Sequence, residues 1–189
     1  MQAVTTAPKA TPVTPGTLYK FLPLPPIPHR ARWFDAGPVS FALEARVLIG
    51  PNEEIKERSA SVHVFSADRS REYVRFDCFG TFQHYHYIQN DKTQMVIWPY
   101  DEAANGPMLP WVLNVIRNRL PLLLQHADAS GLAERVDREG FDCSVLEEIE
   151  EAVRTWKPVT EAESVELAKE ARAWYDRWKE HHPQFNTAA

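Results

Sequence analysis

The side chains most able to do chemistry are concentrated in one short segment, residues 76–87, whose sequence is FDCFGTFQHYHY. The segment holds a carboxylate, a thiol and a His-x-His pair, and it is typical of two strands joined by a turn. Since successive side chains of a strand alternate between faces, His84 and His86 are expected on one side, with Cα atoms roughly 6.6 Å apart. That separation lets both rings reach one metal ion or ligand.

The expected hairpin also predicts what lies opposite the histidines. If a short turn follows Cys78 and Phe79, then Phe79 lies opposite His84 and Asp77 lies opposite His86. The Cβ atoms of opposed residues in an antiparallel pair are about 4.5–5.5 Å apart, so we expect Asp77 to contact His86. Cys78 alternates with Asp77 and is expected on the apolar side, which excludes it as a ligand or nucleophile.

A neighbouring strand extends this polar face. Residues 61–66 place Val62 and Val64 on one side and His63 on the other. For the two valines to share the apolar face of the sheet, His63 must share the face of Asp77. The predicted polar face therefore collects Glu44, Arg46, His63, Arg75, Asp77, His84 and His86.

Several interpretations of this face remain open. Histidines and carboxylates on one surface are the ligands of a Zn, Fe or Mn site, which would consist of His63, Asp77, His84 and His86. A histidine–carboxylate pair is also the arrangement of a general base. A third interpretation is a solvated face, in which an Asp77–His86 ion pair contributes at most about 1 kcal/mol. Apart from this face, a ligand or partner surface that consists of Arg75, Tyr85, Tyr87 and Trp98 is a further interpretation.

The segment with the letters FDCF and HYHY resembles one found in an uncharacterised bacterial protein family. The resemblance covers residues of roughly 40 to 155 and leaves out the N-terminal region. It implies a compact domain and no assigned activity. The His-x-His pair is also similar to part of the cupin motif, but no glutamate follows it within a few residues and no second motif is present.

Hydrophobic periodicity predicts strands first and helices afterwards. About five strands are expected between residues 41 and 98, joined by short turns into an antiparallel meander. Three or four helices are expected between residues 107 and 182, packed on one face of the sheet. Strands followed by helices are typical of an α+β fold, so residues 31–189 are predicted to form a single α+β domain.

Residues 1–30 are predicted to form an extended, proline-rich arm. Seven of the 15 prolines precede residue 29, and proline both fixes φ and removes a hydrogen-bond donor. The arm is too apolar for a simple linker and is expected to dock in a groove, on its own domain or on a partner. The residues expected to dock are Tyr19, Phe21, Leu22, Leu24 and Ile27.

Composition excludes several functional classes. A net charge of -5 argues against nucleic acid and anionic membrane surfaces, both of which require a basic patch. The 7 glycines form no phosphate-binding loop. With neither a signal-peptide pattern nor a long apolar run, the chain is expected in the cytoplasm, where Cys78 and Cys143 remain thiols.

The sequence thus favours a soluble accessory or assembly protein that binds a partner, or a second copy of itself, through the arm and the helical face. The alternative is a metal-dependent enzyme with a His/Asp site on the sheet, in which a divalent metal would be the cofactor. No catalytic residue is assigned by the sequence.

Overall fold

An antiparallel β-sheet is the central element of the computed structural model, which describes residues 16–49, 55–157 and 160–183. Within these residues the sheet has seven strands in the order β1-β7-β6-β5-β4-β3-β2. Their bounds are β1 Thr17–Tyr19, β2 Arg32–Ala36, β3 Val39–Ile49, β4 Ile55–Ser66, β5 Glu72–Asp77, β6 His84–Gln89 and β7 Gln94–Pro99. From β2 to β7 each strand pairs with the next in the chain, so most of the sheet is a meander.

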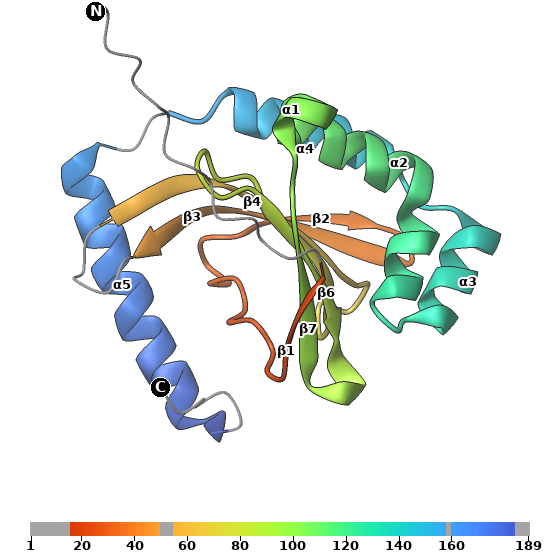
Figure 1. Ribbon diagram of the computed structural model, residues 1–189, viewed down its shortest axis with the longest axis horizontal. Helices are drawn as coiled ribbons and strands as arrows, with labels where there is room; N and C mark the ends of the chain where they lie inside the picture. Colours follow the sequence, from red (N-terminus) through yellow and green to blue (C-terminus); the bar gives the residue numbers. More distant parts are fainter. Residues whose placement is uncertain (1–15, 50–54, 158–159, 184–189) are drawn as a thin grey trace, which may run out of the picture.

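The helices follow the strands, as the periodicity predicts. Their bounds are α1 Glu102–Asn105, α2 Met108–His126, α3 Ser130–Glu139, α4 Ser144–Arg154 and α5 Glu161–Glu180, and a short 3-10 helix, η1, covers Asn90–Lys92 before β7. Figure 1 shows α2 and α4 lying over one face of the sheet, with α3 beside α2. None of the described helices is long and apolar enough to cross a membrane.

The apolar core lies between the sheet and the helices α2–α4. Strand residues such as Val62, Val74 and Phe76 alternate with polar neighbours and meet the buried side chains Ile116 and Leu120 of α2. Each of these five side chains is almost fully removed from water, and burial of a large apolar side chain contributes about 1.5–3 kcal/mol. This alternation fixes which face of every strand is turned toward the helices.

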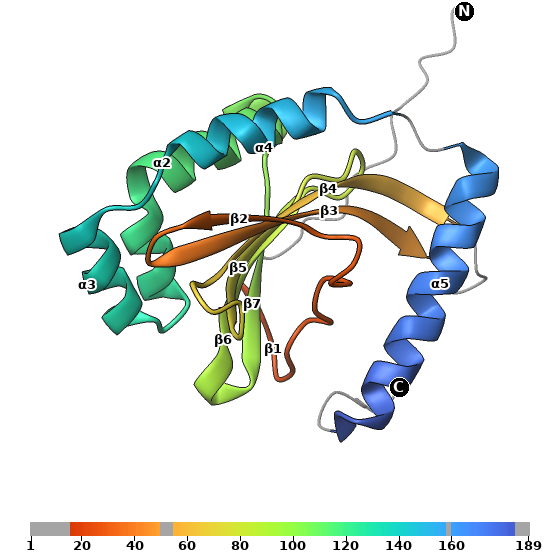
Figure 2. The ribbon, with the colours of Figure 1, turned by 180° about the vertical axis from the view of Figure 1, so that it is seen from behind.

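The other face of the sheet is covered by residues 20–31, here called the strap. The strap connects β1 at one edge of the sheet to β2 at the other edge. Seven strands at about 4.8 Å spacing are roughly 29 Å across, and an extended proline-rich segment of this length reaches about 40 Å. The proline-rich composition therefore suits a chain that must cross the sheet without joining it. Figure 2 shows this crossing from behind.

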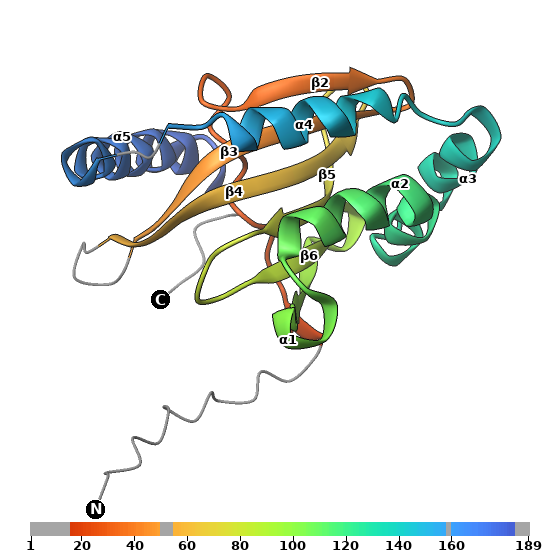
Figure 3. The same cartoon turned by 90° about the horizontal axis from the view of Figure 1, so that it is seen from above.

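Helix α5 holds the strap from outside. It begins with a capping box between Thr160 and Glu163, and its Tyr175 hydroxyl donates a hydrogen bond of 2.9 Å to the carbonyl of Pro25. In Figure 3 this helix lies at the ends of β3 and β4, well away from α2 and α3. Trp174 and Trp178 stack along the helix with ring centroids 6.2 Å apart.

Two predictions about the fold need correction. The described sheet has seven strands rather than five, because β1 and β2 precede residue 41. The helices do not all pack on one face, since α5 contacts the strap. Residues 1–15 of the predicted arm lie outside the described residues.

Candidate functional site

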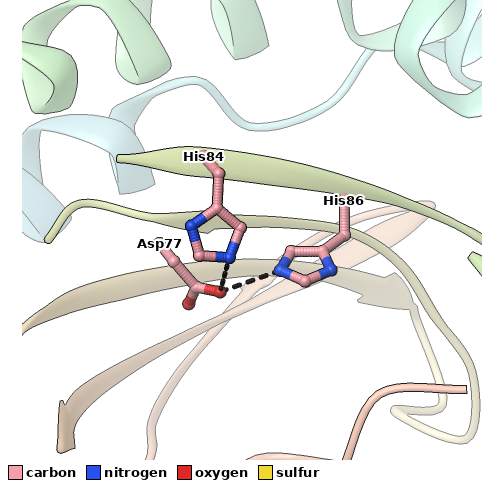
Figure 4. A group of neighbouring side chains, drawn as sticks. All are labelled: Asp77, His84 and His86. Atoms are coloured by element: carbon pink, nitrogen blue, oxygen red, sulfur yellow. Dashed lines mark hydrogen bonds and ion pairs between the residues drawn. The ribbon is translucent and has the colours of Figure 1, made fainter. Parts of the chain in front are cut away.

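Three potential metal ligands converge on the strap-covered face of the sheet. Asp77 Oδ2 lies 3.0 Å from His86 Nε2 and 3.3 Å from His84 Nε2. The three ligand atoms all lie within 4.8 Å of one another, and all three residues are buried. Figure 4 shows both imidazole rings directed at the same carboxylate oxygen. Ligands held about 2.0–2.1 Å from a tetrahedral zinc ion are about 3.3 Å apart, so the two distances from Asp77 Oδ2 are close to those of a coordination site.

The hairpin of β5 and β6 brings these residues together in a register that differs from the prediction. The Cα partner of Asp77 is His84, and the partner of His86 is Arg75. The prediction that His86 lies opposite Asp77 is therefore wrong, because six residues, 78–83, connect the strands instead of a tight turn. The error amounts to two residues, which preserves the face of every side chain. Asp77 reaches His86 diagonally.

The orientation of His84 is the most informative feature of the group. Its Nδ1 lies 2.9 Å from the carbonyl oxygen of Phe82. A carbonyl oxygen can only accept a hydrogen bond, so Nδ1 must be the donor. In a neutral ring, Nε2 then carries a lone pair, and this lone pair faces the carboxylate oxygen of Asp77. Two acceptors in contact repel each other. Either a second proton on His84 or a metal cation between the two atoms removes the conflict.

The ionisation states of the other two residues suit metal binding. Burial lowers the pKa of His86 to about 4, even though the carboxylate of Asp77 acts in the opposite direction. Burial alone would raise the pKa of Asp77, but interactions with His84, His86 and the charge of Arg46 hold it well below its usual range. At neutral pH the site therefore presents an unprotonated carboxylate and a neutral His86 ring, and both are the forms that bind metals.

Ser61 supports the carboxylate from the neighbouring strand. Its Oγ donates a hydrogen bond of 2.5 Å to Asp77 Oδ1, which leaves Oδ2 to face the two histidines. Ser61 and Asp77 are Cα partners in the β4–β5 ladder, so this contact follows from the register. Such outer partners fix the orientation of metal ligands.

Buried carboxylates and cationic groups lie close together on this face. The carboxylates of Glu44, Glu72 and Asp77 are buried. Arg30 and Arg46 act on Glu44, Arg75 and His63 act on Glu72, and Arg46 acts on Asp77. Arg75 is bound to Glu72 through both of its oxygens. Asp77 forms no ion pair with a lysine or arginine in the described part of the chain. A cation bound at Asp77 would add a countercharge beside the two histidines that contact this carboxylate.

His63, the fourth predicted ligand, belongs to a separate network. Its Nδ1 donates to Glu72 Oε1 at 2.7 Å, and its Nε2 lies 3.7 Å from Glu44 Oε2. Arg75 and His63 outweigh the effect of burial and lower the pKa of Glu72 to about 2. The structure therefore brings together Asp77, His84 and His86 and places His63 with Glu72 instead.

The strap closes this second network. The carbonyl of Leu24 accepts hydrogen bonds from Arg75 Nη2 at 2.7 Å and from Arg46 Nη2 at 3.3 Å. The backbone N–H of Ile27 donates to Glu44 Oε1 at 3.2 Å, and the Ile27 side chain is buried. The strap thus supplies backbone partners for charges that would otherwise be buried without them.

The other predicted site residues are dispersed. Tyr19 and Phe21 form an edge-to-face pair with ring centroids 5.5 Å apart. Leu22, the next residue in the chain, is half-buried. Tyr85 and Tyr87 point to the α2 side of the sheet and line a pocket there. Trp98 is partly exposed and is not among the residues that line it.

Cys78 occupies the apolar side, as predicted, and packs against the core. Burial raises the pKa of its thiol to about 12, so it is not a nucleophile at neutral pH. Both cysteines are free.

Sequence reasoning missed Ser61, Glu72 and Tyr175. Ser61 could have been found, because it lies two residues before His63 and hence on the same face of the strand. Glu72 could not, because an irregularity in the β4–β5 ladder next to Val64 changes the strand alternation there. Tyr175 contacts a segment 150 residues away, and local periodicity carries no information about such a contact.

Comparison with known proteins identifies a family that matches most of the chain. Residues 33–153 match the family described as Domain of unknown function (DUF7700). The matched region contains Asp77, His84 and His86, together with α2 and α4, and it excludes the strap and α5. Neither the curated proteins nor the solved structures contain a match to the chain.

Proposed function

The chain belongs to the DUF7700 family, and we propose that it binds one divalent transition-metal ion through Asp77, His84 and His86. One observation carries the proposal: Nε2 of His84 and Asp77 Oδ2 face each other at 3.3 Å while the ring proton of His84 is directed to Phe82. In a neutral His84 ring both atoms present lone pairs, and a metal ion between them would bind both. His86 Nε2, 3.0 Å from the same oxygen, would supply the third ligand.

The ligand set favours a catalytic rather than a purely structural metal. Structural zinc sites are usually closed by four protein ligands, whereas three protein ligands leave a position for water or substrate. Two histidines and one carboxylate are also the ligands of non-haem Fe(II) oxygenases. A metal bound here would lower the pKa of a coordinated water and could polarise a substrate oxygen. We therefore propose a metal-dependent enzyme, with Ser61 positioning Asp77.

The site would be reached past the loop that joins β5 and β6. The Phe82 ring lies 4.4 Å from the ring of His84, centroid to centroid, and Phe82 is 41% exposed. Phe79 covers the same histidine at 6.1 Å and is buried. A substrate would have to displace or approach Phe82, so this side chain would help to select what enters.

Elemental analysis tests the proposal. The protein is produced without a histidine tag, freed of loosely bound ions by gel filtration, and analysed by mass spectrometry for first-row metals, as purified and after incubation with Zn²⁺, Fe²⁺ or Mn²⁺. We expect about one metal ion per chain, lost in His84→Ala and in the near-isosteric Asp77→Asn. His126→Ala is the matched control and should keep the metal. Wild-type protein that holds no stoichiometric metal under any of these conditions would refute the proposal.

Association through the first strand is a second candidate function. β1 is an edge strand, and its Leu18 is 50% exposed. Leu18 is the Cα partner of Val96, so it shares a face with Trp98, which is also partly exposed. Unpaired edge strands with apolar side chains readily pair with another chain. Light scattering on wild type and Leu18→Glu tests this: a dimer that Leu18→Glu dissociates supports it, and a wild-type monomer at high concentration contradicts it.

A further inference from the structure

A pocket of about 440 Å³ lies on the opposite side of the sheet from the metal candidate. Tyr85 and Tyr87 of β6 form its floor, since they alternate with His84 and His86 along the same strand. The remaining lining residues come from α1 and α2, among them Trp111, Val115, Arg119, Leu122, Leu123 and His126. Its size falls within the range of about 300–1,000 Å³ typical of small-molecule sites.

The pocket sits where α2 is interrupted. Arg119 has non-helical dihedral angles, φ -139° and ψ 16°, and Pro121 follows two residues later. Proline lacks an N–H and collides with the carbonyl four residues earlier, which kinks a helix. Ile116 and Leu120, on either side of Arg119, are both buried, whereas Leu122 is exposed. Arg119 and His126 are seven residues apart, a spacing that lies on one face of a helix, and both line the pocket.

The walls of the pocket are aromatic. Tyr85 lies 5.6 Å from Trp111 and 5.7 Å from Tyr87, centroid to centroid. Tyr87 lies 5.1 Å from the ring of His126. Offset and edge-to-face rings at these separations form rigid surfaces against which a planar molecule can stack. Val115 and Leu123 complete the apolar part of the lining.

Three polar side chains of the pocket lack partners in the described part of the chain. Neither phenolic hydroxyl, of Tyr85 or of Tyr87, forms a hydrogen bond there, and Arg119 forms no ion pair. Burial raises the pKa of both tyrosines, so their hydroxyls remain donors at neutral pH. Two unused O–H donors and one unpaired guanidinium at an aromatic pocket are complementary to a ligand that is planar and negatively charged.

We propose that this pocket binds a small aromatic carboxylate. Arg119 would bind the carboxylate, the Tyr85 and Trp111 rings would pack against the aromatic body, and the tyrosine hydroxyls would donate to oxygens of the ligand. The inference does not depend on the metal proposal, because the pocket and the Asp77 group lie on opposite faces. It places a small-molecule site within the region that matches the family.

The test uses 2-naphthoate as a probe, with the uncharged 2-naphthamide as its neutral counterpart. Binding is measured by calorimetry, and the indole N–H signal of Trp111, assigned with Trp111→Phe, is followed by NMR. We expect saturable binding of 2-naphthoate to one site, a shift of the Trp111 signal, and binding of 2-naphthamide weaker by about tenfold or more. Arg119→Met should weaken 2-naphthoate binding by a similar factor.

Arg117→Met is the matched control, since Arg117 is on the same helix and is not among the lining residues. It should bind 2-naphthoate as the wild type does. Tyr85→Phe should weaken binding to a smaller extent, because it removes one hydroxyl and keeps the ring. The proposal is overturned if 2-naphthoate fails to bind at millimolar concentration, if Arg119→Met binds it as tightly as Arg117→Met, or if 2-naphthamide binds equally well.

Discussion

Asp77 and His86 contact each other at 3.0 Å, Oδ2 to Nε2, although they are not partners in the β5–β6 ladder. The residue paired with Asp77 is His84, whose ring reaches the same oxygen. One carboxylate oxygen therefore faces two imidazoles, one from the opposed residue and one from its neighbour two positions along the strand. This arrangement follows from a His-x-His pair on a strand next to an aspartate, and it is the basis of the metal proposal.

Metal ions should stabilise the folded protein through this group. Binding to the folded state alone adds about 2.7 kcal/mol when the ion is present at 100 times its dissociation constant. We therefore expect Zn²⁺ to raise the melting temperature of the wild type by several degrees. The His84→Ala variant should melt at the same temperature with and without Zn²⁺. Calorimetry of both proteins, with a chelator as a further arm, provides the measurement.

Ser61 should tune the affinity for the metal without being a ligand. Its hydroxyl donates to the oxygen of Asp77 that faces away from the histidines. Loss of such an outer contact typically lowers metal affinity by about 10–100-fold. We expect Ser61→Ala to bind Zn²⁺ more weakly by roughly this factor and with unchanged stoichiometry. Competition with a fluorescent zinc chelator measures the affinity, and Ser59→Ala is the control on the same strand. Equal affinities for the two variants would exclude a supporting role for Ser61.

Acid should weaken the fold through Glu72. The pKa of this carboxyl is about 2 in the folded protein against a usual 4.5, so its contribution is present above pH 4.5 and is lost as the pH falls toward 2. This lowering of the Glu72 pKa corresponds to about 3 kcal/mol of folding stability at neutral pH. Urea unfolding from pH 7 to pH 3 should therefore show a steeper loss of stability in the wild type than in Glu72→Gln.

The same variant should already be less stable at pH 7. Removal of the Glu72 charge leaves the Arg75 guanidinium buried without its counterion, which costs about 3–5 kcal/mol. Glu148→Gln, at an exposed carboxyl, should follow the wild type throughout. If Glu72→Gln and the wild type lose stability in parallel as the pH falls, Glu72 does not have the low pKa.

The strap should contribute to the stability of the sheet it crosses. Tyr175→Phe removes the hydrogen bond to the Pro25 carbonyl and is expected to cost about 1 kcal/mol. Ile27→Ala leaves a cavity at a side chain that is 2% exposed and should cost about 2–4 kcal/mol. Leu18→Ala, at an exposed side chain before the strap, should change stability by less than about 0.5 kcal/mol. Urea unfolding distinguishes the three, and equal stabilities would mean that the strap is not held in place.

Alternation along strands allowed much of the polar face to be predicted. His63, Asp77, His84 and His86 all lie on it, because a period of two assigns each side chain to a face whatever the exact pairing. The pairing itself was wrong, since the length of the loop at residues 78–83 is not encoded in alternation. The contacts of Asp77 with both histidines and of His63 with Glu72 depend on the observed register of the strands, which alternation does not predict.

The remaining differences arise from contacts distant in sequence. β1 has three residues, too few for a periodic signal, and pairs with a strand some eighty residues later. The arm was expected to dock in a groove on its own domain or on a partner, and the course of the strap over the sheet depends on Arg75, Glu44 and Tyr175. Helix α5 is amphipathic, and no local pattern indicates which face of the sheet an amphipathic helix will approach.

The most direct test of the metal proposal is a Co²⁺ titration of the metal-free protein, followed by visible absorption. Co²⁺ bound by two histidines and a carboxylate gives ligand-field bands that free Co²⁺ lacks at comparable intensity. For the wild type we predict bands that saturate at one Co²⁺ per chain, and for His86→Ala and Asp77→Asn, folded by circular dichroism, we predict no bands. Bands absent from the wild type, or equally strong in the wild type and in both variants, would contradict a metal site at Asp77, His84 and His86.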